Sequence, residues 1–366
     1  MATTHPFHSA RTHGFVRVAA ATPVVHTGDP VANADEHIAL IRRAAEEGVD
    51  LIVFPELSLT GYAIDDLLMQ EALLDETERQ LTRLCAITEE TRVTAVVGAP
   101  VRAADALYNG AVVIAGGRIC GVTPKTYLPN YREYYEKRWF ASAAGRTALT
   151  QPNAIIDGTE YPMVPGSVYV ADFWPAFKFG VEICEDYWAP LPPSTRMALD
   201  GAMVLLNLSA SNVVIGKADD RALLCASQSA RAMAAYVFTA SGWGESTTDL
   251  AWDGQATIHE LGARLASGER FAMDSRLTIA DIDIDRIRLE RLRTGTFADC
   301  TRLEGADDPF ELSFPNREDA PPSDLIRPLD RFPFVPDDAA RLDQDCYEAF
   351  NIQVQGLMRR LKATGS

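Results

Sequence analysis

Residues 177–188 read FKFGVEICEDYW, an apolar run of strand type that ends at Cys184 and is followed at once by polar residues. Beyond it, residues 202–208 (AMVLLNL) form a second strand-like run. Residues 218–235 have helical periodicity, and residues 236–241 (YVFTAS) form a third strand-like run. Strands that alternate with helices are typical of an α/β layered fold. We therefore expect sheets covered by helices.

The N-terminal half shows the same alternation. Residues 14–22 and 50–54 are strand-like, whereas residues 30–48 and 74–91 have helical spacing. Two strand-like runs within residues 109–123 flank a Gly-Gly pair, which is typical of a hairpin. Because a hairpin pairs its strands antiparallel, we expect mixed rather than purely parallel sheets.

A doubly wound nucleotide-binding fold is the main rival for this pattern. That fold needs a glycine-rich phosphate loop after its first strand. Residues 19–30 read AAATPVVHTGDP at this position, which cannot serve. The G-x-x-x-x-G-K-[ST] and H-E-x-x-H signatures are absent, and the six histidines do not have ligand spacing. The sequence therefore predicts neither a phosphate loop nor a metal site.

Charge and composition narrow the class of partner. The chain has 366 residues, 47% of them hydrophobic, and a net charge of −17. Such an acidic protein repels nucleic acid phosphates and anionic membranes, so we expect neither as a partner. The six cysteines include no C-x-x-C pair, and neither a secretion signal nor an apolar run of transmembrane length is visible. We expect a cytoplasmic protein with free thiols.

Three polar side chains follow strand-like runs, where chemistry is often placed. Cys184 stands at the edge of its strand, exposed to substrate on a rigid element, although a free cysteine is more often a buried hydrophobe. Glu56 follows LIVFP and is a candidate general base, or else a solvated loop residue. Lys125 follows Pro124 and could stabilise an oxyanion or a thiolate, or lie on the surface. The three strengthen one another, because a cysteine nucleophile needs a base and the histidines are poorly placed.

Three motifs, in this order, resemble the nitrilase superfamily: PELSLTGY at 55–62, PKTYLPNYREYYEKR at 124–138 and VEICEDYW at 181–188. Two more, NLSAS at 207–211 and GESTTDLAWDGQ at 244–255, are similar to one branch, the glutaminase domain of glutamine-dependent NAD⁺ synthetases. The resemblance covers roughly residues 14–295 and extends more loosely through the terminal helical segment. It implies a four-layer α-β-β-α sandwich with mixed sheets.

The resemblance also implies roles for the three polar residues. Glu56 takes the thiol proton, and Cys184 attacks the side-chain amide of L-glutamine. Lys125 stabilises the oxyanion with the backbone N–H of Glu185. Ammonia leaves, and water activated by Glu56 hydrolyses the thioester. No metal or other cofactor is implied at this site.

Further residues match the family by motif position. Tyr131, Ser211 and Lys217 align with positions that bind glutamine, and Tyr62, Glu136 and Glu185 align with their neighbours. An acidic side chain suits the substrate's α-ammonium group, and a lysine suits its α-carboxylate. Structural roles are the alternatives: the tyrosines could pack in the interior, Lys217 could be a charge at the start of a helix, and Ser211 could be a loop hydroxyl or a helix cap.

The composition changes after about residue 295. We expect an N-terminal tail over 1–13, the hydrolase domain over 14–295, a linker or surface wrap over 296–336, and a terminal helix over 337–366. That helix either docks on the body or begins a module that this sequence lacks. The family's S-G-G-x-D-S loop is absent, so ATP and deamido-NAD would bind only a missing synthetase domain. The chain is then a fragment, a natural truncation or a separate subunit.

Other functions remain open at this stage. The leading expectation is a glutaminase that forms a homo-oligomer and gives ammonia to a synthetase domain or subunit. The first alternative is a stand-alone amidase of the same superfamily that acts on another small amide. The second is a binding or scaffold protein with a dead site, which the presence of Glu56, Lys125 and Cys184 disfavours.

Overall fold

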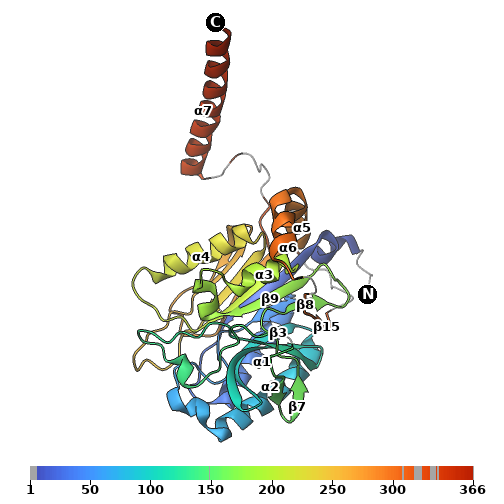
Figure 1. Cartoon of the computed structure of the whole chain (residues 1–366), viewed down its shortest axis with the longest axis vertical. Coiled ribbons are helices and arrows are strands. Elements are labelled where there is room, and N and C mark those ends of the chain that lie inside the picture. The colour runs from blue at the N-terminus through green and yellow to red at the C-terminus, as the bar shows by residue number, and fades with distance from the viewer. Residues whose placement is uncertain are drawn as a thin grey trace. The chain divides into compact units, whose positions relative to one another are not determined.

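The structure is a computed structural model that describes residues 6–147, 149–306, 309–316, 324–329, 335 and 338–365. It divides into two compact units, residues 1–326 and residues 327–366. Both sheets belong to the first unit, in which helices lie on two opposite sides of the sheets (Figure 1).

Within the described residues, the first sheet has eight strands, in the order β14-β1-β2-β3-β4-β5, with β6 and β7 attached through β3. Its strands are β1 (Phe15–Thr22), β2 (Leu51–Val53), β3 (Thr94–Ala103), β4 (Ala106–Ala115), β5 (Arg118–Pro124), β6 (Ala154–Ile156), β7 (Thr159–Tyr161) and β14 (Arg276–Asp283). Strands β1, β2 and β3 are parallel, whereas β4 is antiparallel to both β3 and β5. Strand β5 therefore runs in the same direction as β2.

The second sheet has seven strands in the described part of the chain, in the order β13-β12-β11-β10-β9-β8-β15. Its strands are β8 (Val168–Ala171), β9 (Lys178–Ile183), β10 (Val204–Ser209), β11 (Ala235–Ala240), β12 (Ala256–Glu260), β13 (Ala263–Ser267) and β15 (Glu311–Phe314). Strands β9, β10 and β11 are parallel, and β12 returns antiparallel to β11. Both sheets are mixed, as the sequence predicted.

Helices connect the parallel strands. The α-helices are α1 (Pro30–Glu46), α2 (Glu71–Thr91), α3 (Pro193–Leu199), α4 (Lys217–Arg231), α5 (Ile284–Arg293), α6 (Gly295–Glu304) and α7 (Ala339–Thr364). Local sequence sets their starts: Asp29 caps α1 by accepting the N–H of Ala32 at 3.0 Å, and Pro30 occupies the first helical position. Asp283 caps α5 in the same way, through the N–H of Arg286.

Alternate residues of each central strand pack in different cores, which defines the layers. Val18 of β1 and Leu206 of β10 belong to one core between the two sheets. Ala19, the next residue of β1, packs in a second core with α1 and α2, and Leu205 of β10 packs in a third with α3 and α4. Because side chains alternate between the faces of a strand, the order of layers is helix, sheet, sheet, helix. The predicted α-β-β-α sandwich is confirmed.

Residues 295–314 contain structure that the sequence did not predict. Helix α6 contacts α3 and α5, and strand β15 pairs in parallel with β8 through Leu312 and Phe314. Phe314 is fully buried in the core between the sheets. A strand of four residues in a Pro- and Asp-rich stretch is too short for its alternation of side chains to be recognised. It is stabilised by pairing with a strand more than 140 residues earlier, which the local sequence does not reveal.

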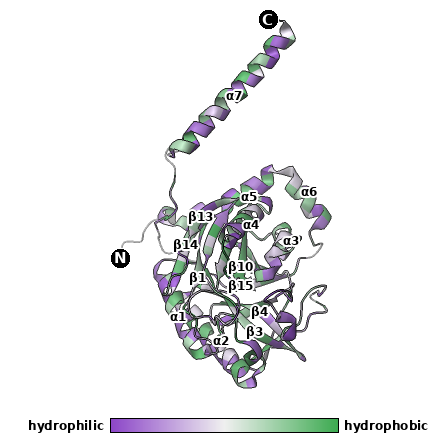
Figure 2. Cartoon of the chain, turned by 90° about the vertical axis from the view of Figure 1, so that its left-hand side faces the viewer, coloured by the Kyte–Doolittle hydropathy of each residue, from purple (hydrophilic) through white to green (hydrophobic). Residues whose placement is uncertain are grey.

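The second unit contains α7, a helix predicted from the spacing of its apolar residues. Asp338 caps it by accepting the N–H of Arg341 at 2.8 Å. None of its described side chains is buried, and Phe350, Leu357 and Leu361 are among its exposed apolar residues. Figure 2 shows hydrophobic and hydrophilic residues interspersed along its length. The domain boundaries drawn from the sequence stay predictions.

Candidate active site

The three candidate catalytic residues follow strands that end at matching edges of the two sheets. Glu56 follows β2, and Lys125 follows β5, which runs in the same direction as β2. Cys184 follows β9 of the other sheet, and Ser211 follows the adjacent parallel strand β10. In α/β sheets, functional groups gather beyond the carboxyl ends of parallel strands. The structure brings these residues together in that position, between the two sheets.

Lys125 lies between two carboxylates in the protein interior. Its Nζ donates to Glu56 Oε1 and to Glu136 Oε1, both at 2.6 Å, and all three side chains are at most 1% exposed. Burial opposes the charge on Lys125, but Glu136 and Glu56 more than compensate and hold its pKa well above the ordinary value. The lysine is therefore a permanent cation at the site.

Two neighbours fix the carboxylate of Glu56 further. Asn109, on β4, donates its side-chain amide to Glu56 Oε1 at 2.7 Å, and the backbone N–H of Ala210 donates to Oε2 at 2.8 Å. The loop that carries Glu56 also lies against β3, because a Cβ added to Gly98 would meet Leu57 N and Pro55 O at 2.4 Å. A glycine at this position lets the loop pack directly on the sheet.

Cys184 begins the 3₁₀ helix η5 (Cys184–Trp188) in a left-handed conformation, with a φ of 44°. Such a backbone is strained for a residue with a side chain, and strain of this kind gathers at functional sites. The sequence placed the sulfur in an exposed position, which is wrong: Cys184 is 6% exposed. The reason is that it lies against the core between the sheets, which the strand pattern alone did not reveal.

Burial and charges of both signs set the properties of the thiol. Burial raises the pKa of Cys184 above its ordinary value, and the negative charges of Glu56 and Glu136 raise it further. Lys125 and the N–H of Ala210 lower it. The thiol is thus neutral at rest, and a negative sulfur can form only as a nearby carboxylate takes its proton.

Glu136 belongs to the same cluster. Its Oε1 also accepts the hydroxyl of Tyr62 at 2.8 Å, whereas its Oε2 is buried without a hydrogen-bond partner among the described residues. Burial, with the charge of Glu56, raises the pKa of Glu136 to about 7, although Lys125 acts in the opposite direction. Glu136 and Tyr62 were both predicted as neighbours of the site. In the structure Glu136 contacts Lys125, and Tyr62 contacts Glu136.

The remaining predicted binding residues lie in η5, at the start of α4 and in the loops after β5 and β10. The hydroxyl of Tyr131 donates to Glu185 Oε1 at 2.7 Å, and Tyr131 is 51% exposed. Lys217 donates to Asn212 Oδ1 and lies over the ring of Trp188. Burial lowers the pKa of Lys217. Their roles in binding stay predictions.

Arg221 holds Ser211 and its neighbour Asn212 through hydrogen bonds. The hydroxyl of Ser211 accepts from Arg221 Nε at 3.2 Å, and the carbonyls of both residues accept from Arg221 Nη2. Arg221 is fully buried and paired with Asp253 at 2.9 Å. This arginine fixes the loop that follows β10.

Several residues of the site were missed in the sequence. They are Asn109, Tyr134, Asp186, Asn212, Arg221, Glu245 and Asp253. The hydroxyl of Tyr134 donates to Asn212 Oδ1, and Glu245 Oε1 accepts the N–H of Tyr62, both at 2.8 Å. Asn109 carried a usable signal, a single amide inside the apolar strand LYNGAVV, because a buried amide needs partners. Arg221 carried none, since it stands in a polar helical turn that reads as a solvated surface.

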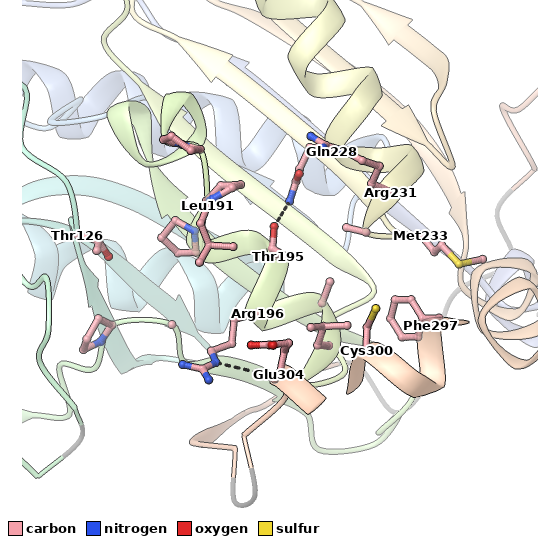
Figure 3. Close-up of a pocket in the computed structure, with 18 of the residues that line it drawn as sticks. Thr126, Leu191, Thr195, Arg196, Gln228, Arg231, Met233, Phe297, Cys300 and Glu304 are labelled. Carbon is pink, nitrogen blue, oxygen red and sulfur yellow. Dashed lines mark hydrogen bonds between the residues drawn. The ribbon is translucent and has the colours of Figure 1, made fainter. Parts of the chain in front are cut away.

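Two hollows lie near these elements. A small one of about 40 Å³ is lined by Tyr62, Glu133 and Tyr134 among others. A larger pocket of about 840 Å³ is lined by α3, the end of α4, α6 and the loop after Lys125 (Figure 3). Gln228 donates to Thr195 in its wall at 3.0 Å. Glu56, Lys125 and Cys184 are not among its lining residues, so it is distinct from the cluster around Lys125.

Across the described ranges, no group of three or more His, Cys, Asp or Glu side chains is arranged to hold a metal ion. None of the helices that the structure describes is long and apolar enough to cross a membrane.

The fold and this cluster agree with the result of comparison with known proteins. A family model described as carbon-nitrogen hydrolase matches residues 16–291. The chain belongs to the carbon-nitrogen hydrolase family, and it is an amide C–N hydrolase by class. The resemblance to the nitrilase superfamily is thereby confirmed.

Individual relatives are more specific. The chain is 48% identical over 359 residues to the glutamine-dependent NAD(+) synthetase of Mycobacterium tuberculosis (strain ATCC 25618 / H37Rv), and the match covers 98% of this chain and 52% of the relative. It is 45% identical, with the same coverage, to the synthetase of Mycobacterium leprae (strain TN). The chain therefore spans about half the length of the curated relatives it matches.

Solved structures give the same picture. A glutamine-dependent NAD(+) synthetase from Cytophaga hutchinsonii superposes with a TM-score of 0.64 at 25% identity, covering 73% of this chain and 43% of that one. A carbon-nitrogen hydrolase from Helicobacter pylori G27 superposes with a TM-score of 0.61 at 18% identity, covering 80% and 97%. The second likeness shows the fold alone.

Proposed function

We propose that this protein hydrolyses the side-chain amide of L-glutamine to glutamate and ammonia, and that the ammonia is used for NAD⁺ synthesis. The observation that carries the proposal is the buried ammonium group of Lys125, held at 2.6 Å from both Glu56 and Glu136 beside Cys184. A buried cation next to a thiol and a carboxylate is suited to stabilise an oxyanion. The similarity to glutamine-dependent synthetases supports glutamine as the substrate.

The first half-reaction forms a thioester. Glu56 accepts the proton of the Cys184 thiol as the sulfur attacks the amide carbon, and the carbonyl oxygen becomes an oxyanion. Lys125 and the backbone N–H of Glu185 stabilise this oxyanion. The C–N bond then breaks, the nitrogen takes the proton from Glu56, and ammonia leaves.

The second half-reaction restores the enzyme. Glu56 removes a proton from water as the water oxygen attacks the thioester carbon, and Lys125 again stabilises the oxyanion. The C–S bond breaks, and the proton passes to the sulfur of Cys184. Glutamate leaves, and no proton or electron remains unaccounted for.

Recognition of the amino acid end of glutamine is assigned to the loops around Cys184. Glu185, with the hydroxyl of Tyr131 on its Oε1, supplies negative charge for the α-ammonium group. Lys217 supplies positive charge for the α-carboxylate, and Ser211 offers a hydroxyl. These contacts select strongly for glutamine. An amide that lacks the α-ammonium and α-carboxylate groups would leave the charges of Glu185 and Lys217 unpaired.

The wider setting is also part of the proposal. Relatives of twice this length suggest a synthetase region, in the same or another chain, that accepts the ammonia and binds ATP and deamido-NAD. We expect a homo-oligomer in the cytoplasm. Gel filtration with light scattering tests the oligomer, and a monomeric mass would contradict it.

The experiment is an assay of ammonia and glutamate release from L-glutamine, asparagine and a simple aliphatic amide. We expect Cys184→Ala to lower turnover of glutamine at least about 10³-fold while the melting temperature stays close to wild type. Cys300→Ala, at an exposed cysteine, is the matched control and should keep full activity. Turnover by Cys184→Ala at the wild-type rate excludes the mechanism, and preference for the aliphatic amide excludes glutamine as substrate.

A further inference from the structure

Asp186 connects the chain segment that carries Cys184 with the segment that carries Lys125. It lies two residues after Cys184 in η5 and is 1% exposed. Its Oδ2 accepts the backbone N–H of Ile183 at 3.0 Å, and its Oδ1 accepts that of Tyr127 at 2.8 Å. The N–H of Thr126 also points to Oδ2, at 3.4 Å. One carboxylate thus joins the end of β9, in one sheet, to the loop after Lys125, which follows β5 in the other.

The loop that Asp186 holds borders a hollow, and the carbonyl of Thr126 accepts the hydroxyl of Ser142 at 2.6 Å. Thr126 and Tyr127 line the pocket of about 840 Å³, where Figure 3 shows Thr126 in the wall. Lys125 itself is fixed at its N–H by the carbonyl of Asn109 and at its carbonyl by the N–H of Ala143. The next two residues direct their N–H groups to Asp186 instead. Burial raises the pKa of the Asp186 carboxyl group to about 8, although the N–H groups of Ile183 and Tyr127 act in the opposite direction.

The other end of the connection is the strained turn of the nucleophile. Ile183 is the last residue of β9, and Cys184 adopts its left-handed conformation directly after it. A strained conformation persists only where its surroundings determine it. The bond from Ile183 N to Asp186 closes that turn and supplies such a restraint.

We propose that Asp186 is a positioning residue, which holds the turn of Cys184 and the loop of Lys125 in one arrangement so that the sulfur and the oxyanion both face the ammonium group. The inference rests on the proposed function, in which Cys184 is the nucleophile and Lys125 its cationic partner. Asp186 acts through backbone N–H groups and does not touch the substrate.

Replacing Asp186 with asparagine keeps the volume of the side chain but removes one of its two hydrogen-bond acceptors. The carboxyl group of Asp186 presents one oxygen to each N–H group, whereas a carboxamide has one acceptor oxygen and turns two N–H donors outward. In Asp186→Asn, the N–H of either Ile183 or Tyr127 must face a donor, so one end of the connection is released. A misplacement of about 1 Å in such a site costs about 100-fold in rate.

The test compares Asp186→Asn with Asp281→Asn. Asp281 is also 1% exposed and accepts a backbone N–H, that of Ile326, together with Arg17, but lies on β14 away from Cys184. For Asp186→Asn we expect kcat for glutamine to fall about 100-fold with KM within about threefold. Asp281→Asn should lose stability and keep its kcat.

A second measurement does not depend on the substrate. Alkylation of Cys184 by iodoacetamide, followed by mass spectrometry of its peptide as a function of pH, reports how readily the thiol ionises. Glu56, Glu136, Lys125 and Lys217 are charged groups that interact with this thiol. If Lys125 is displaced, the midpoint in Asp186→Asn moves to higher pH, while in Asp281→Asn it stays at the wild-type position.

The outcomes separate this inference from the proposed function. A normal kcat with an unchanged alkylation midpoint in Asp186→Asn overturns the positioning role. A wild type that hydrolyses no amide, but whose alkylation midpoint still moves in Asp186→Asn, overturns the function and leaves the positioning role standing. If Asp186→Asn does not fold, Asp186→Glu, which keeps two acceptor oxygens, takes its place. Its alkylation midpoint then decides: a shift to higher pH supports the role, and the wild-type value overturns it.

Discussion

Glu136 holds a proton more tightly in the folded protein than in the unfolded chain. Burial and the charge of Glu56 raise its pKa from the ordinary 4.5 to about 7. Between these values the folded state binds more protons than the unfolded state, so the free energy of unfolding falls as the pH rises through this window. The residue that stabilises the charge of Lys125 therefore lowers the stability of the fold above neutral pH.

We expect Glu136→Gln to remove this dependence. Gln is neutral at every pH, so the variant should lose less stability than wild type between pH 5 and pH 7, by at most about 3 kcal/mol. Urea unfolding at pH 5, 6 and 7 measures the slope for both proteins. Parallel slopes would mean that Glu136 is ionised throughout the range. The same substitution should lower turnover, because Lys125 loses one of its two carboxylates.

At the scale of elements, β3 positions the loop of Glu56 by its lack of a side chain at Gly98. A methyl group there would meet the backbone of Pro55 and Leu57 at 2.4 Å, a distance that cannot be kept. Either the strand or the loop must move, and the loop carries Glu56, the proposed general base.

We expect Gly98→Ala to lose about 1–3 kcal/mol of stability through overpacking and to lower kcat about 100-fold through displacement of Glu56. Gly295→Ala is the matched control, because a Cβ at Gly295 meets nothing within 4 Å. Thermal unfolding and glutamine turnover of the two variants give the comparison. Wild-type turnover in Gly98→Ala would show that the loop of Glu56 tolerates the shift.

The ends of strands could be predicted from the sequence, but the contacts between them could not. Apolar runs that stop before Glu56, Lys125 and Cys184 singled these residues out as candidates, because a strand end fixes the place of the next side chain. The family resemblance then supplied their expected roles. The burial of Cys184 and the contact from Asp186 to Tyr127 depend on how two sheets face each other. Residues 59 positions apart come together only through that packing, which no local pattern encodes.

Strand β15 illustrates the same limit. Its four residues bury Phe314 between the sheets, yet they come after a long stretch of irregular composition. A short edge strand is stabilised by its partner and its core contacts rather than by its own propensity. The family motifs quoted from the sequence all lie before residue 256 and give no indication of this strand.

At the scale of the whole molecule, the catalytic cluster belongs to residues 1–326. The last residues of that unit, from Asp324 to Ile326, are held by the Arg17–Asp281 pair, since Arg17 donates to the carbonyl of Asp324 and Ile326 N donates to Asp281. The exposed side chains of α7, in contrast, contribute no buried surface within the described part of its unit.

We expect a chain ended after Ile326 to melt within about 2 °C of the full chain and to keep its glutaminase activity, because burial rather than helix propensity supplies most stability. Calorimetry and the ammonia assay on both chains provide the measurement. A large fall in the melting temperature would show that residues 327–366 contact the body or hold an assembly together. In that case, light scattering on both chains distinguishes the two explanations, because only the loss of an assembly lowers the number of subunits.

At the left-handed turn of Cys184, the side chain that the proposed function needs lowers the stability of the fold. A residue with a side chain is costly at a φ of 44°, whereas glycine adopts this conformation freely. A chain selected only to resist heat would therefore carry glycine at this position and would be catalytically dead. If Cys184 is the nucleophile, as proposed, a substitution that abolishes activity is also one that the backbone favours.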